Sequence, residues 1–120
     1  MLSSSPRKGG NSDLLCDRFI SGAKETGHDT EKIFLKDKEI NYYRGCGTCL
    51  NKNKQFHFIA TAADSSKPAI ERTFEGFRCF TSCLDGAIEK GTIYGTGAWN
   101  IGDIKDKPAM QEAYYLGFSV

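Results

Sequence analysis

The sequence predicts an α/β protein with an open sheet of largely parallel strands. Short apolar runs that suit strands alternate along the chain with longer segments in which apolar residues recur every three or four positions, as on one face of a helix. This alternation is typical of a parallel sheet whose connections are helices. The 120 residues, of which 39% are hydrophobic and 26% charged, suit one small globular domain over residues 1–120.

The first third of the chain predicts a polar loop that leads into a helix. Residues 3–10 are small, polar or basic, and apolar residues then recur at helical spacing over 12–26. Asn11 or Ser12 can cap the start of this helix, and Gly27 can supply the left-handed residue that ends it. The first feature of the chain is therefore a loop that ends at a helix N-terminus.

The rest of the chain alternates strands with helices. The expected order is a strand over 30–35, a loop over 41–53, a strand over 55–62, a helix from Pro68 to Gly86, a strand over 91–97 and a helix from Pro108 to Leu116 that Gly117 closes. The apolar residues expected on the buried face of the second helix are Ile70, Phe74, Phe77, Thr81 and Leu84. Ligands of such sheets bind at the carboxyl ends of strands, beside helix N-termini.

Residues 3–12 have the composition of a phosphate-binding loop. Arg7 can form a bidentate pair with a phosphate, and Gly9 and Gly10 allow the backbone to approach an anion. The residues that can donate further hydrogen bonds are Ser5, Asn11 and Ser12. The Gly-Lys-Ser or Gly-Lys-Thr ending of the nucleotide-triphosphate loop is absent from the sequence. Residue types alone leave a second interpretation open, a polar N-terminal tail that ends in a helix cap.

These residues resemble a known family. The stretch from Ser4 to Ser12 looks like the FMN-phosphate loop of the NADPH-dependent FMN reductase family, a flavodoxin-like group. Gly45-Cys46-Gly47-Thr48-Cys49 is similar to the Gly-Cys-Gly-x-Cys segment of the branch related to iron-sulfur flavoproteins. Further similar segments lie at 61–64, 94–99 and 102–109, in the order of the family.

The resemblance implies a flavodoxin-like open parallel sheet with helices on both faces and FMN as the cofactor. The residues it assigns to the FMN phosphate are Ser5, Arg7, Gly10, Asn11 and Ser12, and those it assigns to the flavin ring or ribityl chain are Thr61, Ala62 and Ala63. Such enzymes pass hydride from a nicotinamide nucleotide, NAD(P)H, to FMN and then to a small-molecule substrate or electron acceptor. Because the flavin carries the reaction, no side chain is assigned a catalytic role.

Two parts of the family pattern are missing. Only Met1 and Leu2 precede Ser3, so most of the first strand is absent, and Cys49 is followed almost directly by the strand over 55–62, so the third strand is absent as well. In a sheet ordered 2-1-3-4-5 these are the two central strands. We therefore expect open strand edges. Three explanations stay open: segments of a longer molecule that this sequence omits, a shortened member of the family, or a homo-oligomer, a dimer or larger, in which another chain covers the edges.

Composition disfavours several classes of partner. A net charge of +1 provides no field for gathering nucleic acid or an anionic membrane surface. No apolar stretch is long enough to span a bilayer, and the first residues lack the apolar core of a secretory signal, so a cytoplasmic location is expected. Five cysteines are an odd number, so reduced thiols are expected rather than a disulfide framework.

Alternatives to the flavin enzyme stay open at this stage. The chain could be a shortened, non-enzymatic assembly subunit, or a thiol or metal protein built on Cys46 and Cys49. Tyr43 stands where cluster-bearing relatives have a cysteine, so no metal is assigned. Buried packing is the expected role of Cys79 and Cys83, which are spaced i, i+4 on a helix. The aromatic residues Tyr94, Trp99, Tyr114 and Tyr115 could stack on a ring, but packing is the default.

Overall fold

The computed structural model describes residues 1–42, 44, 45, 47 and 53–120. The elements follow in the order β1 (Leu2–Ser3), α1 (Asn11–Glu25), β2 (Ile33–Phe34), β3 (Lys54–Thr61), α2 (Lys67–Thr81), β4 (Ala87–Gly95) and α3 (Pro108–Phe118), with short 3-10 turns at Leu35–Asp37 and Asp103–Asp106. The strands are parallel and alternate with helices, which confirms the α/β class. In the described part of the chain, no helix is both long enough and apolar enough to cross a membrane.

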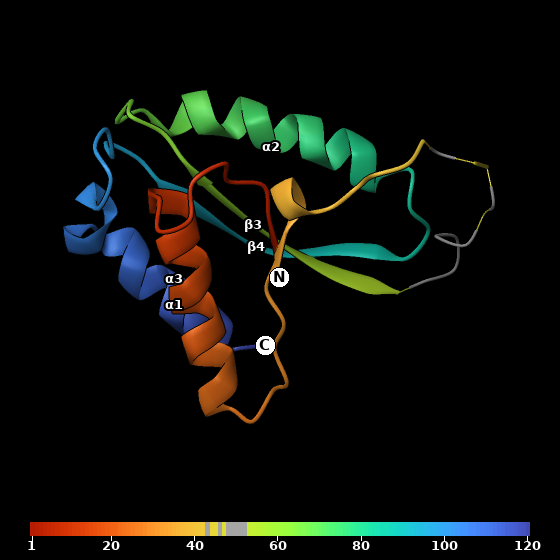
Figure 1. Ribbon diagram of the computed structural model, residues 1–120, viewed down its shortest axis with the longest axis horizontal. Coiled ribbons are helices and arrows are strands. Elements are labelled where there is room, and N and C mark those ends of the chain that lie inside the picture. Colours follow the sequence, from red (N-terminus) through yellow and green to blue (C-terminus); the bar gives the residue numbers. More distant parts are fainter. Residues whose placement is uncertain (43, 46, 48–52) are drawn as a thin grey trace.

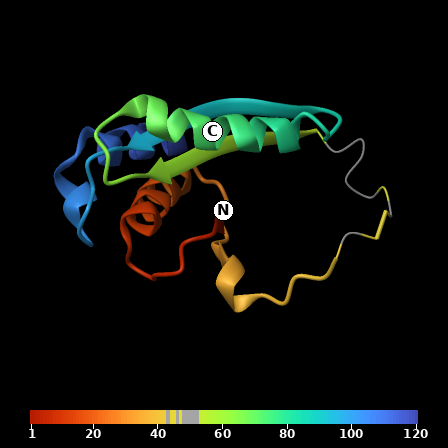
Figure 2. The same cartoon turned by 90° about the horizontal axis from the view of Figure 1, so that it is seen from above.

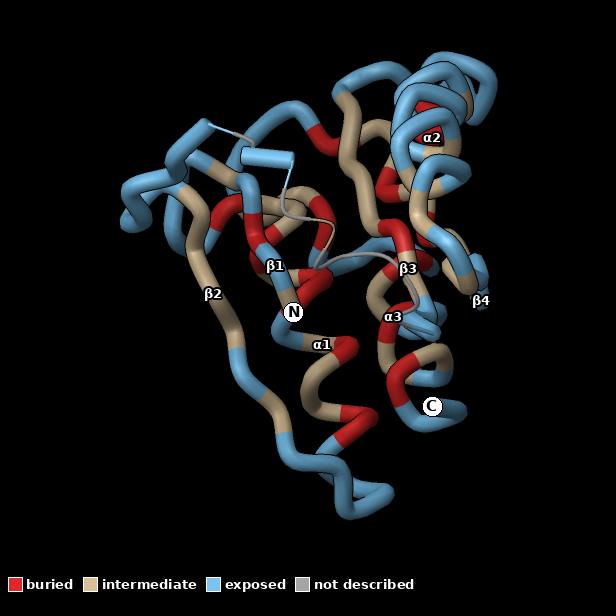
Figure 3. The backbone as a smooth tube through the Cα atoms, turned by 90° about the vertical axis from the view of Figure 1, so that its right-hand side faces the viewer, coloured by how far each residue is buried: buried red, intermediate tan, exposed pale blue. Residues whose placement is uncertain are grey.

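The strands form two separate parallel pairs in place of one continuous sheet. β1 pairs with β2 over two residues each, whereas β3 pairs with β4 from Lys54 opposite Ala87 to Thr61 opposite Gly95. Among the described residues no strand joins β1 to β3, although α1 contacts both pairs (Figure 3). A β1 of only two residues and the absence of a joining strand among the described residues are compatible with the shortened sheet that the sequence predicts.

The β3–β4 pair lies between two helical layers. α2 covers one face, while α1 and α3 pack together on the other (Figures 1 and 2). Successive strand residues point to opposite faces, so Phe58 packs under α2 and Ile59 packs toward α1. The buried residues of the α1–α3 core are Leu15, Phe19, Ile93, Ala98, Ile104, Ala109 and Ala113, and those of the α2 core are Phe58, Ile70 and Phe74.

Gly117 does not end α3, as the sequence predicts, but lies inside it at the contact with α1. A Cβ atom added to Gly117 would lie 2.8 Å from the carbonyl carbon of Phe19 and closer still to its oxygen. Gly22 plays the matching part on α1, because its added Cβ would lie 2.7 Å from the backbone nitrogen of Phe118. The glycines therefore let the two helix backbones approach closely, which a side chain would prevent.

α2 differs from its prediction in length and in what it buries. It ends at Thr81, because a turn over 82–86 precedes β4 and Gly86 takes its left-handed conformation, φ +73°, in that turn. Ile70 and Phe74 are buried, but Phe77 is 49% exposed because only a two-stranded sheet lies beneath the helix. The expected packing of Cys79 and Cys83 is wrong for the same reason, since both are exposed.

Two strands also differ from their predicted bounds. β4 begins at Ala87, four residues before the predicted start, because it pairs with β3 from the first residue of that strand. The strand predicted over 30–35 shortens to Ile33–Phe34, since its partner β1 has only two residues with which to pair. The loop over 41–53 lies mostly outside the described residues, with Cys46 and Cys49 in it.

Candidate functional site

Three loops that follow strands are joined by hydrogen bonds at the start of α1. The Asn11 side-chain amide donates to the carbonyl oxygens of Ala98 (3.2 Å) and Asn100 (2.8 Å), and its oxygen accepts the Gly102 N–H (2.9 Å). The Ala98 N–H in turn donates to the Ala62 carbonyl at 3.0 Å. The loop after β1 and the loops after β3 and β4 therefore meet at one place.

The loop between β1 and α1 is folded by its own hydrogen bonds. The Ser5 hydroxyl donates to the Arg7 carbonyl at 2.9 Å and accepts the Arg7 N–H at 3.3 Å, and the Gly10 N–H donates to the same carbonyl at 3.3 Å. Gly9 has φ +76°, a conformation that side chains rarely adopt, and Gly10 is buried. The loop thus closes into a tight turn immediately before the helix.

A buried carboxylate anchors this turn. Asp13, in the first turn of α1, accepts the Gly9 N–H at 2.7 Å and forms an ion pair with Lys32, which also contacts Asp17 at 2.6 Å. Burial alone would raise the pKa of Asp13, but the hydrogen bonds from Lys32 and Gly9 outweigh it and hold that pKa below its ordinary value. Burial likewise opposes the charge on Lys32, yet Asp13 and Asp17 raise its pKa.

The helix start differs from its prediction. The N-cap residue is Gly10, and neither Asn11 nor Ser12 caps the helix through its side chain. Asn11 serves instead to hold the 98–102 loop, and the Asp13 carboxylate satisfies the Gly9 N–H one residue before the cap. The contact of Asn11 joins residues far apart in the sequence, and the contact of Asp13 depends on the turn of the loop before the helix. The sequence pattern of a helix cap therefore predicted neither contact.

Arg7 and Lys8 are the exposed cations of the loop, and they differ in their partners. Lys8 pairs with Asp37 at 3.2 Å and lies over the Phe34 ring, whereas Lys36 donates to the Pro6 carbonyl at 3.4 Å. Within the described residues Arg7 makes no ion pair, and its side chain is exposed to solvent. Its guanidinium is thus available to an anion at the helix start.

The loop after β3 is fixed by the loop after β4. The Ala62 N–H donates to the Gly95 carbonyl at 3.0 Å, and the Gly97 N–H donates to the Asp64 carbonyl at 2.9 Å. The three predicted residues of this loop differ in exposure, because Thr61 and Ala62 are half-buried and Ala63 is exposed. The structure thus brings Asn11 and Ala62 to one site through Ala98.

Trp99 differs from its default expectation of packing and fits the alternative of stacking on a ring. It lies between the two residues whose carbonyls Asn11 holds, and its side chain is 79% exposed. A default of core packing is wrong for this residue. An exposed aromatic ring on a fixed loop can cover a planar ligand, and the exposure that favours this role is visible only in the structure.

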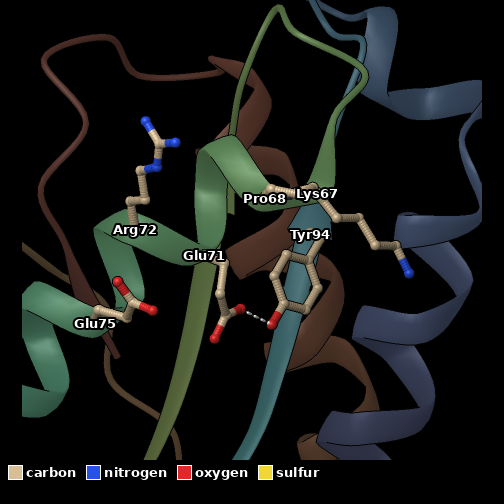
Figure 4. A pocket seen from close by; sticks show the side chains of 6 residues that line it. All are labelled: Lys67, Pro68, Glu71, Arg72, Glu75 and Tyr94. Atoms are coloured by element: carbon tan, nitrogen blue, oxygen red, sulfur yellow. Dashed lines mark hydrogen bonds between the residues drawn. The ribbon is translucent and has the colours of Figure 1, made fainter.

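A hollow between α2 and β4, apart from the three joined loops, combines charges of both signs. Its lining residues are Lys67, Pro68, Glu71, Arg72, Glu75 and Tyr94 (Figure 4). The Tyr94 hydroxyl donates to Glu71, and Arg78 pairs with Glu71 and, through two bonds of 2.7 and 2.8 Å, with Glu89. The Tyr94 and Arg78 hydrogen bonds hold the pKa of Glu71 below its ordinary value. Of the charged side chains that line this hollow, Glu71 is held by Arg78 and Tyr94, and Lys67 lies over the Tyr94 ring, 5.6 Å from its centroid.

Thiol and metal chemistry has limited support in the described residues. Cys16 is a buried free thiol whose pKa burial raises to about 11. No group of three His, Cys, Asp or Glu side chains in this part of the chain is arranged to hold a metal ion. Cys46 and Cys49, on which the thiol or metal hypothesis depends, lie outside the described residues.

Comparison with known proteins gives partial matches. The chain is 42% identical over 50 residues to an iron-sulfur flavoprotein of Archaeoglobus fulgidus. The matched segment covers 42% of this chain and 23% of that protein. Part of the chain is similar to iron-sulfur flavoproteins. The chain is also 33% identical over 52 residues to an iron-sulfur flavoprotein of Methanosarcina thermophila, a match that covers 43% of this chain and 27% of the relative. A third match, to an iron-sulfur flavoprotein of Methanocaldococcus jannaschii, is 42% identical over 53 residues and covers 44% of this chain and 28% of the relative. The matched segments thus span about a quarter of each relative. No family model and no solved structure matches the chain.

Proposed function

We propose that this chain binds FMN at the three joined loops and acts as an NAD(P)H-dependent oxidoreductase that passes electrons through the flavin to an acceptor. The observation that carries the proposal is the set of hydrogen bonds from Asn11 through Ala98 to Ala62, which unites a helix-start loop with the loops after two parallel strands. Ligands of α/β sheets bind at such places. The names of the relatives, iron-sulfur flavoproteins, support a flavin as the ligand.

The residues at the start of α1 suit the FMN phosphate. The first-turn N–H groups of Asn11 and Ser12 have no partner within a helix, and the helix dipole favours an anion there. Arg7 and the Ser12 hydroxyl add side-chain donors, whereas Ser5 contributes by folding the turn. Since the Asn11 side chain is bonded to the 98–102 loop, its contribution to the phosphate is the backbone N–H. A Cβ atom on Gly10 would lie 3.3 Å from the Arg7 carbonyl, so a side chain there would crowd the turn.

The flavin ring would lie against the loop after β3, with Thr61, Ala62 and Ala63 along it and Trp99 near its other side. Small side chains on one side and an exposed aromatic ring on the other suit a flat heterocycle. When bound, FMN accepts hydride from a nicotinamide and releases electrons to an acceptor. The residues of the chain orient the flavin and shape its electrostatic surroundings, and none of them is needed as a nucleophile or general acid.

The open edges of the strand pairs favour a second candidate, a non-enzymatic assembly subunit. No strand joins β1 to β3 in the described part of the chain, so the flavin side of the sheet is incomplete relative to the family pattern. Mass spectrometry of the native protein separates the two candidates, because bound FMN excludes the flavin-free subunit.

Titration with FMN tests the flavin proposal. Trp99 is the only tryptophan of the chain, so a flavin bound beside it quenches the tryptophan fluorescence. Arg7→Ala should weaken FMN binding by about 10- to 100-fold, the equivalent of a charge-assisted bond of about 1.5 to 3 kcal/mol. Arg72→Ala, which removes an exposed arginine from α2, serves as the matched control and should leave the affinity unchanged. Equal affinities for the two variants would remove the phosphate role of Arg7. Oxidation of NADH or NADPH by the loaded protein then tests the electron donor.

A further inference from the structure

The edge of β3 that does not pair with β4 is open in the described residues. Across α2, Glu71 and Arg78 reach Tyr94 and Glu89 on β4, so this side of the helix lies above β4. Phe77 and Phe80 lie on the other side of the helix, and Phe77 contacts Phe58 of β3 with ring centroids 5.6 Å apart. The two rings are 49% and 62% exposed, and their spacing of three residues places Phe80 next to Phe77 on the helix surface. We refer to Phe77 and Phe80 as the acceptor strip.

An open edge of this kind is unfavourable for a small parallel sheet. Parallel strands are normally covered on both faces and paired on both sides, and an isolated two-stranded pair is marginal. β1 and β3 each have a single paired neighbour among the described residues, and α1 contacts both pairs. An added strand beside β3 would satisfy the unpaired backbone groups of that edge and would cover the acceptor strip.

The chain carries a segment with the properties of such a strand. Residues 39–42 run without helix or turn, and Lys38 before them has extended backbone angles, φ −116° and ψ 139°. Ile40 is 71% exposed and Tyr42 is 97% exposed. Because alternate residues of an extended segment point to the same side, Ile40 and Tyr42 form one apolar side, and the polar Glu39 and Asn41 form the other. We refer to residues 39–42 as the donor segment.

The two sides of the donor segment match the two sides of the β3 edge. Phe58 and the acceptor strip lie on the α2 side, which suits Ile40 and Tyr42. His57 points to the opposite side, toward Phe19, and burial together with the charge of Lys90 lowers its pKa. In its own chain the donor segment runs outward from the body of the protein (Figure 2).

We propose that a second copy of this chain lays its donor segment along the open edge of β3, with Ile40 and Tyr42 against Phe77 and Phe80, and receives the donor segment of the first copy in return. A second copy is the occupant because one chain carries both complementary surfaces, and a two-fold exchange uses each of them once. This exchange is independent of flavin binding. It removes from water four of the large apolar side chains that the single chain exposes.

Sedimentation velocity over about a hundredfold dilution tests the exchange with two sets of double variants. Ile40→Lys with Tyr42→Lys disables the donor segment, and Phe77→Lys with Phe80→Lys disables the acceptor strip. Each set should weaken the dimer by about a hundredfold, because buried aromatic anchors carry most of an interface's binding energy. The control Tyr115→Lys changes a 61% exposed aromatic residue of α3 and should leave the dimer intact.

Mixing the two sets of variants provides the decisive comparison. The acceptor variant keeps an intact donor segment and the donor variant keeps an intact acceptor strip, so a mixed dimer regains one of the two crossings and should form more tightly than either variant alone. A wild type that stays monomeric throughout the dilution, a dimer unaffected by either set, or variants that do not recover on mixing would each overturn the proposal. If the acceptor variant fails to fold, the donor variant still decides, because Ile40 and Tyr42 are largely exposed in the single chain.

Discussion

The contact between α1 and α3 makes a quantitative prediction for Gly117→Ala. The new methyl carbon would lie 2.8 Å from the carbonyl carbon of Phe19, against an ordinary carbon–carbon contact of about 3.5 to 4.0 Å. Since the obstructing atoms are backbone, relief requires the two helices to separate by about 1 Å. Overpacking usually costs about 1 to 3 kcal/mol, and a clash with backbone atoms belongs to the upper part of that range, about 2 to 3 kcal/mol, whereas the better helix propensity of alanine returns about 1 kcal/mol. We expect a net loss of about 1 to 2 kcal/mol in the free energy of unfolding.

Thermal unfolding followed by circular dichroism measures this loss. For a chain of this size it corresponds to a decrease in Tm of about 4 to 8 °C. The matched control is Gly76→Ala in α2, where an added Cβ would have no atom within 4 Å. That variant should raise the free energy of unfolding by about 0.5 to 1 kcal/mol, because only the helix propensity changes. If both alanine variants shift Tm in the same direction, the close approach of α1 and α3 is refuted.

Three further predictions concern named side chains. Asp13→Asn should reduce the free energy of unfolding by about 1 to 3 kcal/mol at neutral pH, because Lys32 then keeps only Asp17 as an ion-pair partner. The pKa of Asp13 is lowered from 3.8 in the folded chain, so its contribution to stability is present above that pH and is lost as the pH falls further. The stability of the variant should therefore change less with pH in acid than that of the wild type. Equal acid profiles in urea unfolding would argue against this ion pair. Trp99→Ala should weaken FMN binding about tenfold, as measured by flavin fluorescence. It should leave Tm unchanged, because the Trp99 ring is 79% exposed. An unchanged affinity would show that Trp99 does not contact the flavin. Cys79 and Cys83 are exposed and should react with a thiol reagent in the folded protein. Cys16 is buried and its pKa is raised to about 11, so it should react only on unfolding. Peptide mapping measures the labelling of each cysteine, and equal labelling of Cys16 and Cys79 would contradict the packing of α1.

Local patterns predicted the elements whose signals are themselves local. The helical spacing over 12–26 places α1 within one residue at each end, and the apolar run over 55–62 does the same for β3. The predicted end of α3 at Leu116 was wrong, because a glycine near the end of a helix can either stop the helix or allow close packing. Gly117 resembles a left-handed stop in sequence, and only its approach to Phe19 reveals a packing role.

Contacts between distant residues account for what the sequence did not predict. Lys32 and Asp13 are 19 residues apart, and Asn11 reaches across the chain to the 98–102 loop. The exposure of Phe77, Cys79 and Cys83 depends on how many strands lie beneath α2, which periodicity along the helix does not record. The assignment of Ser5, Arg7, Gly10, Asn11 and Ser12 to a phosphate stays a prediction, as does that of Thr61, Ala62 and Ala63 to the flavin.

A comparison of FMN with riboflavin tests the central claim most directly, because the two ligands share the flavin ring and differ in the phosphate. We predict saturable quenching of Trp99 fluorescence by FMN and at least about tenfold weaker binding of riboflavin, since the helix start and Arg7 would contact only the phosphate. Equal affinities for the two ligands, or no binding of either, would contradict a phosphate-anchored flavin at these loops.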